Sequence, residues 1–368
     1  MPVTTPIVQF GTSRFLQAHA DLFFSEGRPA GAITVVQSSG DPSRAGRLGA
    51  LADPAGYPVL IRGMQDGQVV DEERRVTSVK RTLSTASDWE ELSRIVTGEA
   101  EAILSNTGDS GYDPKPADTA PAPEQAMSYP AKLFHLLKAR QAAGRPPLAI
   151  FPMELIPDNG HVLKARVLEI AAQQGADPAL TGWLGGCLWV NSLVDRIVSA
   201  PLDPVGAVAE PYALWAIEAQ PGLAAPVDHP SVQVVEKLET IERLKLHILN
   251  LGHTAMVAFW QEAGADPDAI VRDLLAGPVG ARLKAVMAEE VLPGFALRGM
   301  ETEAEAYLAT TLERFANPFL DHRIADIAQN HPQKTERRIS AFLSWVREVE
   351  PGFAAPVLDA ICAAPVPA

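Results

Sequence analysis

The chain has 368 residues, of which 47% are hydrophobic and 21% charged, a composition typical of a globular protein with two or three domains. Its 45 acidic and 31 basic residues give a net charge of −14, which argues against nucleic acid or an anionic membrane as the main partner. No apolar run approaches membrane-spanning length, and the first residues lack the regions of a signal peptide, so we expect a cytoplasmic protein.

The first predicted element is a strand at residues 7–10, which leads into a glycine turn and a helical pattern at 17–24. A strand, a tight glycine turn and a helix start form the phosphate cradle of a dinucleotide-binding fold, because free backbone N–H groups face the pyrophosphate. Ser13 and Leu16 occupy the second and third glycine positions of the G-x-G-x-x-G fingerprint. The segment therefore fits either a cofactor turn with a less close approach to phosphate or an ordinary strand-to-helix turn.

Three further strands are predicted at residues 33–37, 101–105 and 147–151, and they alternate with helical patterns at 131–142 and 162–173. This alternation predicts an α/β fold with a mostly parallel sheet that is covered on both faces. Ligands bind at the carboxyl ends of such strands, where the polar loops that follow them converge.

The end of the second strand bears on the choice between NAD and NADP. An acidic side chain there holds the adenosine ribose, whereas arginine favours a 2′-phosphate. Asp41 lies a few residues too late, and Arg44 and Arg47 follow it. The sequence therefore leaves both cofactors open.

Two charges, Asp195 and Arg196, interrupt an apolar run at residues 191–198. They fit either an ion pair on a partly buried strand or a position near the substrate. From residue 237 the pattern becomes helical almost throughout, with helices predicted at 282–290, 303–314 and 334–349. We therefore expect a Rossmann-like dinucleotide-binding domain over residues 1–236 and an all-helical C-terminal domain over residues 237–368.

The helix predicted at residues 242–260 is unusual because it is apolar nearly all round. Leu244, Ile248, Leu251, Ala255 and Phe259 form one stripe, while Lys245, Asn250 and His253 lie within roughly 140° of arc among other apolar residues. Polar groups on a buried helix either find structural partners or take part in chemistry. The structural alternative is that Lys245 reaches water along its apolar stem and that His253 is a hydrogen-bonded core residue.

Several stretches together resemble one family, the polyol-specific long-chain dehydrogenases, which include mannitol dehydrogenases and hexuronate reductases. The resemblance is carried by residues 9–16, 194–198, 210–215, 314–318, His322, and the K-x-x-x-x-N-x-x-H pattern of Lys245, Asn250 and His253. Residues 105–107, 128–133 and 154–160 look most like tagaturonate reductases, also called altronate oxidoreductases. The chain departs from the pattern at Ser13, Met153 and Leu251, and it is shorter than typical hexuronate reductases.

The resemblance implies a metal-independent, NAD(P)-dependent enzyme that interconverts a secondary alcohol and a ketone on an open-chain sugar acid or polyol. NAD is the expected cofactor, with NADP not excluded. Lys245 would be the general acid and base, and Asn250 and His253 would donate hydrogen bonds to the reacting oxygen. The implied cofactor-binding residues are Gly11, Thr12, Ser13, Arg14, Phe15, Asn106 and Thr107, and the implied substrate-binding residues are Asn159, Asp195, Arg196, Arg314 and His322.

A sugar-acid substrate needs a cationic partner for its carboxylate. Arg196 and Arg314 rank first among the candidates, because guanidinium holds a carboxylate in a bidentate manner, and His322 and Lys334 follow. Arg314 also fits a helix C-terminal cation that interacts with the helix dipole.

Three other functions are weighed against the sugar-acid reductase. A mannitol-type polyol dehydrogenase shares the same motifs, and the altered turn at Ser13 would also suit a nucleotide-binding sensor without catalysis. A zinc-dependent dehydrogenase is disfavoured, because Cys187 and Cys362 lie far apart and have no ligand cluster around them.

Overall fold

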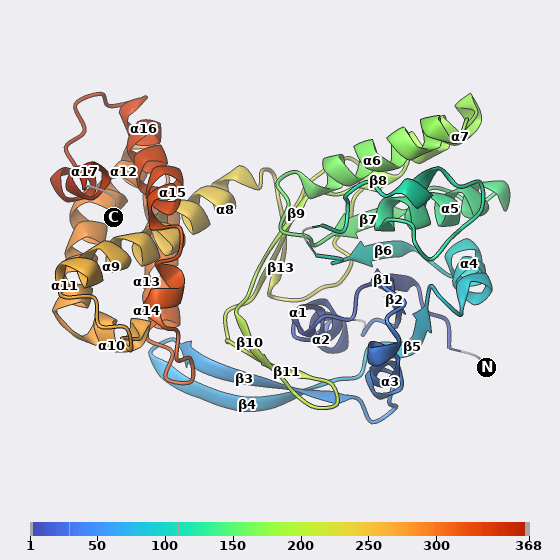
Figure 1. Ribbon diagram of the computed structural model, residues 1–368, viewed down its shortest axis with the longest axis horizontal. Helices are drawn as coiled ribbons and strands as arrows, with labels where there is room; N and C mark the ends of the chain where they lie inside the picture. The colour runs from blue at the N-terminus through green and yellow to red at the C-terminus, as the bar shows by residue number, and fades with distance from the viewer. Residues whose placement is uncertain (1–2, 29, 109, 365–368) are drawn as a thin grey trace. The chain divides into compact units, whose positions relative to one another are not determined.

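The chain divides into two compact units in the computed structural model, which describes residues 3–28, 30–108 and 110–364 (Figure 1). The sheet unit comprises Met1–Ile61, Glu72–Ala209 and Ala213–Leu238, and the helical unit comprises Arg62–Asp71, Glu210–Tyr212 and Glu239–Ala368. The main break at Leu238 lies close to the predicted boundary. Two short segments from the first part of the chain belong with the helices, which the sequence did not indicate.

The sheet unit is built on six parallel strands in the order β5-β2-β1-β6-β7-β8. Numbered along the chain within this sheet, the order is 3-2-1-4-5-6, that of the Rossmann fold. Phe10 at the end of β1 pairs with Val36 of β2 on one side and with Ser105 of β6 on the other. The direction of the strand order therefore reverses between β1 and β6. The strands are β1 (Ile7–Phe10), β2 (Ile33–Gln37), β5 (Val79–Ser84), β6 (Ala102–Ser105), β7 (Ala149–Pro152) and β8 (Leu188–Trp189). The predicted parallel sheet is confirmed.

Helices cover this sheet because its central strands are apolar at nearly every position and must be buried on both faces. Val8, Ile103 and Ile150 of the strands share one core with Leu133 of α5 and Val167 of α6. The helices of the sheet unit are α1 (Arg14–Gln17), α2 (Ala20–Glu26), α3 (Pro42–Leu51), α4 (Trp89–Gly98), the 3₁₀ turn η1 (Pro116–Thr119), α5 (Tyr129–Ala142), α6 (Asn159–Gln173) and α7 (Pro178–Gly185).

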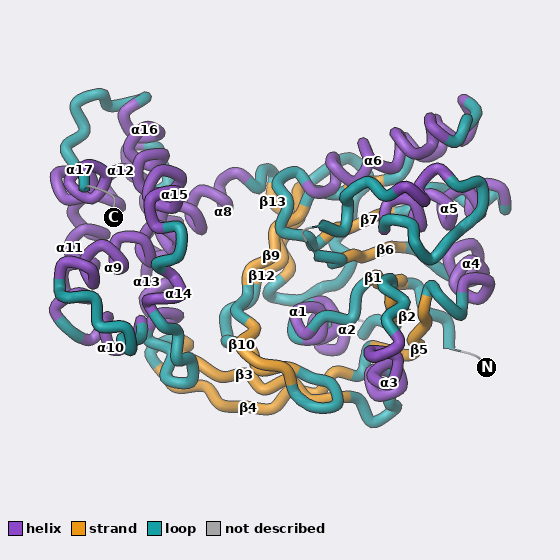
Figure 2. Tube along the Cα trace, in the orientation of Figure 1, coloured by secondary structure: helices purple, strands orange, loops and turns teal. Residues whose placement is uncertain are grey.

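Two smaller sheets, drawn with the other strands in orange in Figure 2, were not predicted. One has the order β10-β11-β3-β4 and the other the order β13-β12-β9. Asp66 and Gly67 join β3 to β4 with φ angles of 53° and 73°, the left-handed conformations of a two-residue hairpin turn. The strands are β3 (Tyr57–Gln65), β4 (Gln68–Val76), β9 (Ser192–Asp195), β10 (Val198–Pro201), β11 (Ala207–Ala209), β12 (Leu214–Glu218) and β13 (Val232–Val235).

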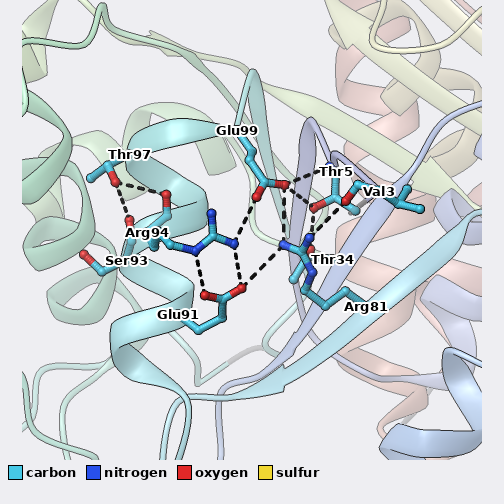
Figure 3. Close-up of polar contacts among 9 residues, drawn as sticks. All are labelled: Val3, Thr5, Thr34, Arg81, Glu91, Ser93, Arg94, Thr97 and Glu99. Carbon is cyan, nitrogen blue, oxygen red and sulfur yellow. Dashed lines mark hydrogen bonds and ion pairs between the residues drawn. The ribbon is translucent and has the colours of Figure 1, made fainter. Parts of the chain in front are cut away.

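A polar network fastens the segment before β1 to its neighbours (Figure 3). The Glu99 carboxylate, just after α4, accepts hydrogen bonds from the Thr5 amide at 3.0 Å and from Arg94 at 3.2 Å. Arg81 of β5 lies 3.4 Å from the same carboxylate, and the Thr5 hydroxyl lies 2.7 Å from that of Thr34 in β2. The start of β1 is therefore held by side chains from three other elements.

The helical unit is organised around a long helix made of α8 (Glu239–Leu244), a π-helical turn η2 (Lys245–Asn250) and α9 (Leu251–Glu262). Helical dihedrals at Leu244 and Asn250 make these pieces continuous, which confirms the predicted helix. Every residue from Leu251 to Trp260 is buried. The core around them includes Phe295 and Phe342.

The remaining helices of this unit cover the buried α9. They are α10 (Val271–Ala276), α11 (Pro278–Val286), the π turn η3 (Met287–Val291), α12 (Leu292–Leu297), α13 (Glu301–Phe315), α14 (Ile324–Ile327), α15 (His331–Thr335), the π turn η4 (Glu336–Ser340), α16 (Ala341–Arg347) and α17 (Pro356–Ala363). Across the described ranges, no helix has both the length and the apolar character that crossing a membrane requires.

Candidate active site

The turn after β1 is shaped by Gly11, whose φ of 126° disfavours any other residue. A Cβ at this position would lie 2.6 Å from the carbonyl oxygen of Asn106, the residue that follows β6. Ser13, which replaces the second glycine of the fingerprint, accepts a hydrogen bond from the Leu16 amide at 3.3 Å. The serine therefore closes the turn with its own side chain, as an N-cap residue does.

A cavity of about 660 Å³ lies at the carboxyl ends of β1, β2 and β6. Six of the predicted cofactor residues line it, namely Gly11, Thr12, Ser13, Arg14, Asn106 and Thr107. Phe15 is not among the lining residues; its ring stacks on His19 at 4.8 Å between centroids. The structure thus brings the predicted turn and the loop after β6 into one pocket, as expected at the point where strand order reverses.

The pocket is cationic in a way that the sequence analysis did not identify. Besides Arg14, its lining includes Arg47, Lys115 and Lys132, and no aspartate or glutamate of the described residues contributes to it. Lys132 is 2% exposed and donates to the Ser38 carbonyl at 2.7 Å, and burial, with nearby Lys115, lowers its pKa to about 8. Such a lining suits a polyanion such as a pyrophosphate.

The residues after β2 present amide and hydroxyl groups to the pocket rather than a carboxylate. Gln37, Ser38 and Ser39 line it, whereas Asp41 caps α3 by accepting from the Ser43 amide at 2.9 Å. The side chain of Arg44 lies outside the described part of the structure.

Glu154 positions the loop after β6, a role that the sequence analysis did not assign to it. Its buried carboxylate accepts from the Ser105 hydroxyl at 3.0 Å, from the Thr107 amide and hydroxyl at 3.0 Å each, and from the Tyr112 hydroxyl at 2.8 Å. Because Thr107 lines the pocket, these bonds fix part of the pocket wall. The signal available in the sequence was a carboxylate directly after a predicted buried strand.

The predicted substrate residue Asn159 is committed to backbone partners. Its amide nitrogen donates to the carbonyls of Pro152, Glu154 and Ser192 at 3.1, 3.0 and 2.8 Å, and its oxygen accepts from the Ser192 amide at 3.0 Å. The side chain is 1% exposed. Asn159 therefore joins β7, α6 and β9, and the prediction that it binds a substrate hydroxyl is not supported by this geometry.

Asp195 and Arg196, at the end of β9, are both 7% exposed. One guanidinium nitrogen of Arg196 donates to the Ala18 carbonyl at 2.6 Å. His19 lies close by, and burial, with a smaller effect of Arg196, lowers its pKa to about 3 despite its hydrogen bond to the Leu214 carbonyl. This bond joins the segment after β9 to the C-terminal end of α1, and the predicted roles of Asp195 and Arg196 stay predictions.

In the helical unit, Lys245 and Asn250 are the first and last residues of the π turn η2. An α-helix would separate them by about 140°, but a π turn bonds residues five apart, so it brings both ends of the K-x-x-x-x-N spacing to one side. Both side chains are half-buried, so the shielding of Lys245 that the sequence predicted is partial. π turns occur often at functional sites.

His253 lies one turn further along, in α9. Its ring stacks on Phe315 with centroids 4.1 Å apart, and the edge of His322 meets it at 5.5 Å. Burial holds the pKa of His253 well below 6.5, and the neighbouring basic groups, among them His322 and Arg338, act in the same direction. The imidazole is therefore neutral at pH 7, with one N–H to donate and one lone pair.

Arg314, a first choice for the substrate carboxylate, already holds a carboxylate of this chain. Its Nε and Nη2 donate to Glu210 at 3.0 and 2.8 Å, and both side chains are almost completely buried. The guanidinium also lies over the Tyr212 ring, 4.4 Å from its centroid. Arg314 sits in the last turn of α13, as the helix C-terminal alternative predicted. The carboxylate of Glu210 thus occupies the guanidinium edge that was expected to receive a substrate carboxylate, and this geometry does not support the predicted role.

The strand order and the pocket are those of a dinucleotide-binding Rossmann fold, to which a helical unit is added. Among the described residues, no three histidine, cysteine, aspartate or glutamate side chains gather in a metal-binding arrangement.

Comparison with known proteins gives the family. The Mannitol dehydrogenase Rossmann domain matches residues 5–228 and the Mannitol dehydrogenase C-terminal domain matches residues 237–358, so the chain belongs to the mannitol dehydrogenase family. This membership confirms the resemblance found in the motifs and the expected enzyme class, a dehydrogenase acting on a CH–OH group.

The relatives and structural neighbours agree with this family. Altronate oxidoreductase of Klebsiella pneumoniae (strain 342) is 30% identical, over 90% of this chain and 73% of its own, and that of Bacillus subtilis (strain 168) is 28% identical over the same shares. A substrate-free D-sorbitol dehydrogenase has a TM-score of 0.79 at 19% identity, covering 94% of this chain and 77% of its own. Pseudomonas fluorescens mannitol 2-dehydrogenase, solved with NAD and D-mannitol, has a TM-score of 0.72 at 18% identity, and the match covers 97% of this chain and 77% of that enzyme's chain. These two structures confirm the predicted fold class.

Proposed function

We propose that the chain is an NAD-dependent dehydrogenase that interconverts a secondary alcohol and a ketone on an open-chain sugar acid of the altronate type. The observation that carries the proposal is the grouping of Lys245, Asn250 and His253 along one π turn and the turn after it in a largely buried helix. The names of the relatives support a sugar acid, and the NAD in the solved mannitol 2-dehydrogenase supports the cofactor. The assay below compares NAD with NADP as the cofactor.

Lys245 takes the proton of the substrate hydroxyl during oxidation and returns it during reduction, while the nicotinamide, when bound, supplies the hydride chemistry. Asn250 donates an amide hydrogen to the same substrate oxygen. His253 donates the N–H of its neutral ring, which burial keeps uncharged. Two such preorganised donors stabilise alkoxide character in the transition state, each by roughly 3 kcal/mol.

The pocket of the sheet unit binds the cofactor in this proposal. The backbone of Gly11, Thr12 and Ser13 and the side chains of Arg14 and Lys115 face the pyrophosphate, since all five line the cavity. Asn106 and Thr107 form the wall after β6. We also propose a cytoplasmic location. Neither nucleic acid nor an anionic membrane is the main partner in this proposal, which rests on the net charge of −14.

A mannitol-type polyol dehydrogenase is the second candidate. It is favoured by the pairing of Arg314 with Glu210, which removes one cation from the candidates for a substrate carboxylate. A nucleotide-binding sensor without catalysis is a third, suggested by Ser13 in place of a glycine.

One assay separates these functions. The absorbance of reduced nicotinamide is followed with D-altronate, D-mannitol and D-sorbitol, each with NAD and NADP, and in parallel with a chelator. We expect NAD-linked oxidation of altronate that the chelator leaves unchanged. Oxidation of the neutral polyols alone would establish the second candidate, and cofactor binding without turnover of any substrate would establish the sensor.

A further inference from the structure

Two cations, Lys334 of α15 and Arg338 of η4, lie on segments that pack against the helix of Asn250 and His253. Arg338 donates to the hydroxyl of Thr254, the residue next to His253, and both cations act to lower the pKa of the buried imidazole. Most other arginines of the helical unit have acidic partners, for example Arg314 with Glu210 and Arg347 with Asp359, whereas the exposed Arg337 has none among the described residues. Neither Lys334 nor Arg338 has a carboxylate within ion-pair distance among the residues that the structure describes.

Arg338 is held by the same turn that carries the proposed catalytic residues. It lies in the π turn η4, and its Nη1 donates to the Asn250 carbonyl at 3.3 Å and to the Thr254 hydroxyl at 3.1 Å. In return, the ring of His247 bonds the Arg338 carbonyl at 3.1 Å. The two π turns therefore lock each other, and the position of Arg338 is fixed relative to Asn250.

These contacts use one edge of the guanidinium. The Nε and Nη2 groups of Arg338 make no hydrogen bond within the described ranges, and the side chain is half-buried, so this edge is open to a ligand. A guanidinium edge with two parallel N–H groups matches the two oxygens of a carboxylate.

Lys334 is one helical turn before Arg338 and has donors to spare. Its Nζ donates to the Ile327 carbonyl at 2.7 Å, which uses one of its three N–H bonds and fixes the ammonium. Two like charges four residues apart on a helix repel each other, and an anion bound between them would relieve this repulsion.

We infer that Arg338 and Lys334 form the receptor for the substrate carboxylate, with Arg338 binding it through its free edge and Lys334 adding the second charge. The inference rests on the proposed function and specifies it, because it makes the enzyme selective for sugar acids over polyols of the same carbon skeleton. Arg338 is then the residue that joins substrate recognition to the π turn of Lys245 and Asn250.

The test compares one acid with its neutral counterpart. The kcat and KM of the wild type, Arg338→Gln, Lys334→Gln and Arg338→Lys are measured with D-altronate and with D-altritol, in which a CH₂OH group replaces the carboxylate. We expect Arg338→Gln to raise KM for altronate by roughly 10- to 100-fold, the range for a lost charge-assisted hydrogen bond, with altritol changed little. Lys334→Gln should act in the same direction more weakly, and Arg338→Lys should recover part of the loss.

The neighbouring Arg337 supplies a matched control, because it is exposed and lies in the same π turn. Arg337→Gln removes the same charge and should leave both substrates unchanged. If Arg338→Gln lowers kcat for acid and polyol alike, Arg338 only holds the π turn and the inference is wrong. An unchanged KM for altronate also overturns it.

Failure of the proposed function gives a different result. If the wild type turns over neither substrate, the proposed reaction is wrong. The carboxylate receptor is then tested by calorimetric titration of altronate into the NADH-loaded protein. Weaker binding in Arg338→Gln than in Arg337→Gln supports the receptor. Equal binding in both variants, or no binding to the wild type, overturns it.

Discussion

The two units differ in what their buried polar side chains bond to. In the sheet unit, the side chains of Glu154 and Asn159 each make four hydrogen bonds with groups of the chain, which occupy most of their bonding positions. In the helical unit, Arg338 and Lys334 use only part of their donors and have no acidic partner among the described residues. The number of unused donors therefore separates the structural groups of the sheet unit from the proposed recognition groups of the helical unit.

The helical unit also contains its own counterexample, Arg314. Arg314 is more deeply buried than Arg338 and Lys334, and it holds the carboxylate of Glu210, a residue 104 positions earlier in the chain. A buried pair with this geometry stabilises little in itself but is costly to break, because removal of one partner leaves an unpaired charge. We therefore assign it to the architecture of the unit.

The largest expected effect is on chemistry in the helical unit. Lys245→Met removes the amine and keeps a similar side-chain volume, so kcat for altronate should fall by about 10²- to 10⁴-fold, the usual contribution of a general acid or base. Binding of NADH, measured by fluorescence titration, should not change. Lys284→Met, on the exposed side of α11, is the matched control and should retain full activity. Full activity of Lys245→Met would remove this residue from the mechanism.

The next effect concerns stability in the sheet unit. Burial raises the pKa of Asp21 from 3.8 to about 7, although the Tyr57 hydroxyl donates to it at 2.6 Å. Between these pH values the native state keeps a proton that the unfolded chain releases, so raising the pH favours unfolding by up to about 1.4 kcal/mol per pH unit. Above pH 7 both states are ionised and the effect is constant.

The variant Asp21→Asn tests the direction of this pH effect on stability, because asparagine has no proton to release. Urea unfolding of the variant and the wild type at a series of pH values should show the variant gaining relative stability as the pH rises from about 4 to 7, with no further gain above that. A difference in unfolding free energy that does not depend on pH would show that the carboxyl titrates normally.

The smallest effect links stability to the cofactor. Glu154→Gln can keep an oxygen toward the Thr107 amide, but its NH₂ group then replaces the acceptor of the Ser105 and Tyr112 hydroxyls, and loss of these charge-assisted bonds should cost about 1–3 kcal/mol. Since Thr107 lines the pocket, the dissociation constant for NADH should rise as well. Glu101→Gln, exposed just before β6, is the control. Weaker NADH binding without loss of stability would mean that Glu154 contacts the cofactor instead of positioning the loop.

Much of the sheet unit could be predicted, because its strands are short apolar runs whose pattern is local. The strand predicted at 33–37 is β2 as observed, and the turn at Gly11 lies in the pocket as expected. The sequence did not predict that Lys132 contributes a charge to the pocket, because the polar residues of its helix, α5, show no periodic pattern. Its contact with Ser38 joins residues 94 apart.

The sequence by itself determined the class of fold, the helix at residues 242–260 and the spacing of Lys245, Asn250 and His253, because hydrophobic periodicity and fixed spacing are properties of neighbouring residues. Only the tertiary structure decided that this spacing falls on a π turn, that Glu210 occupies Arg314, and that Arg338 is locked beside Asn250 with one edge open. Each of these features depends on which groups from distant parts of the chain accept a given hydrogen bond or neutralise a given charge. Pairing of that kind is settled by packing in three dimensions, and no local pattern in the chain records it.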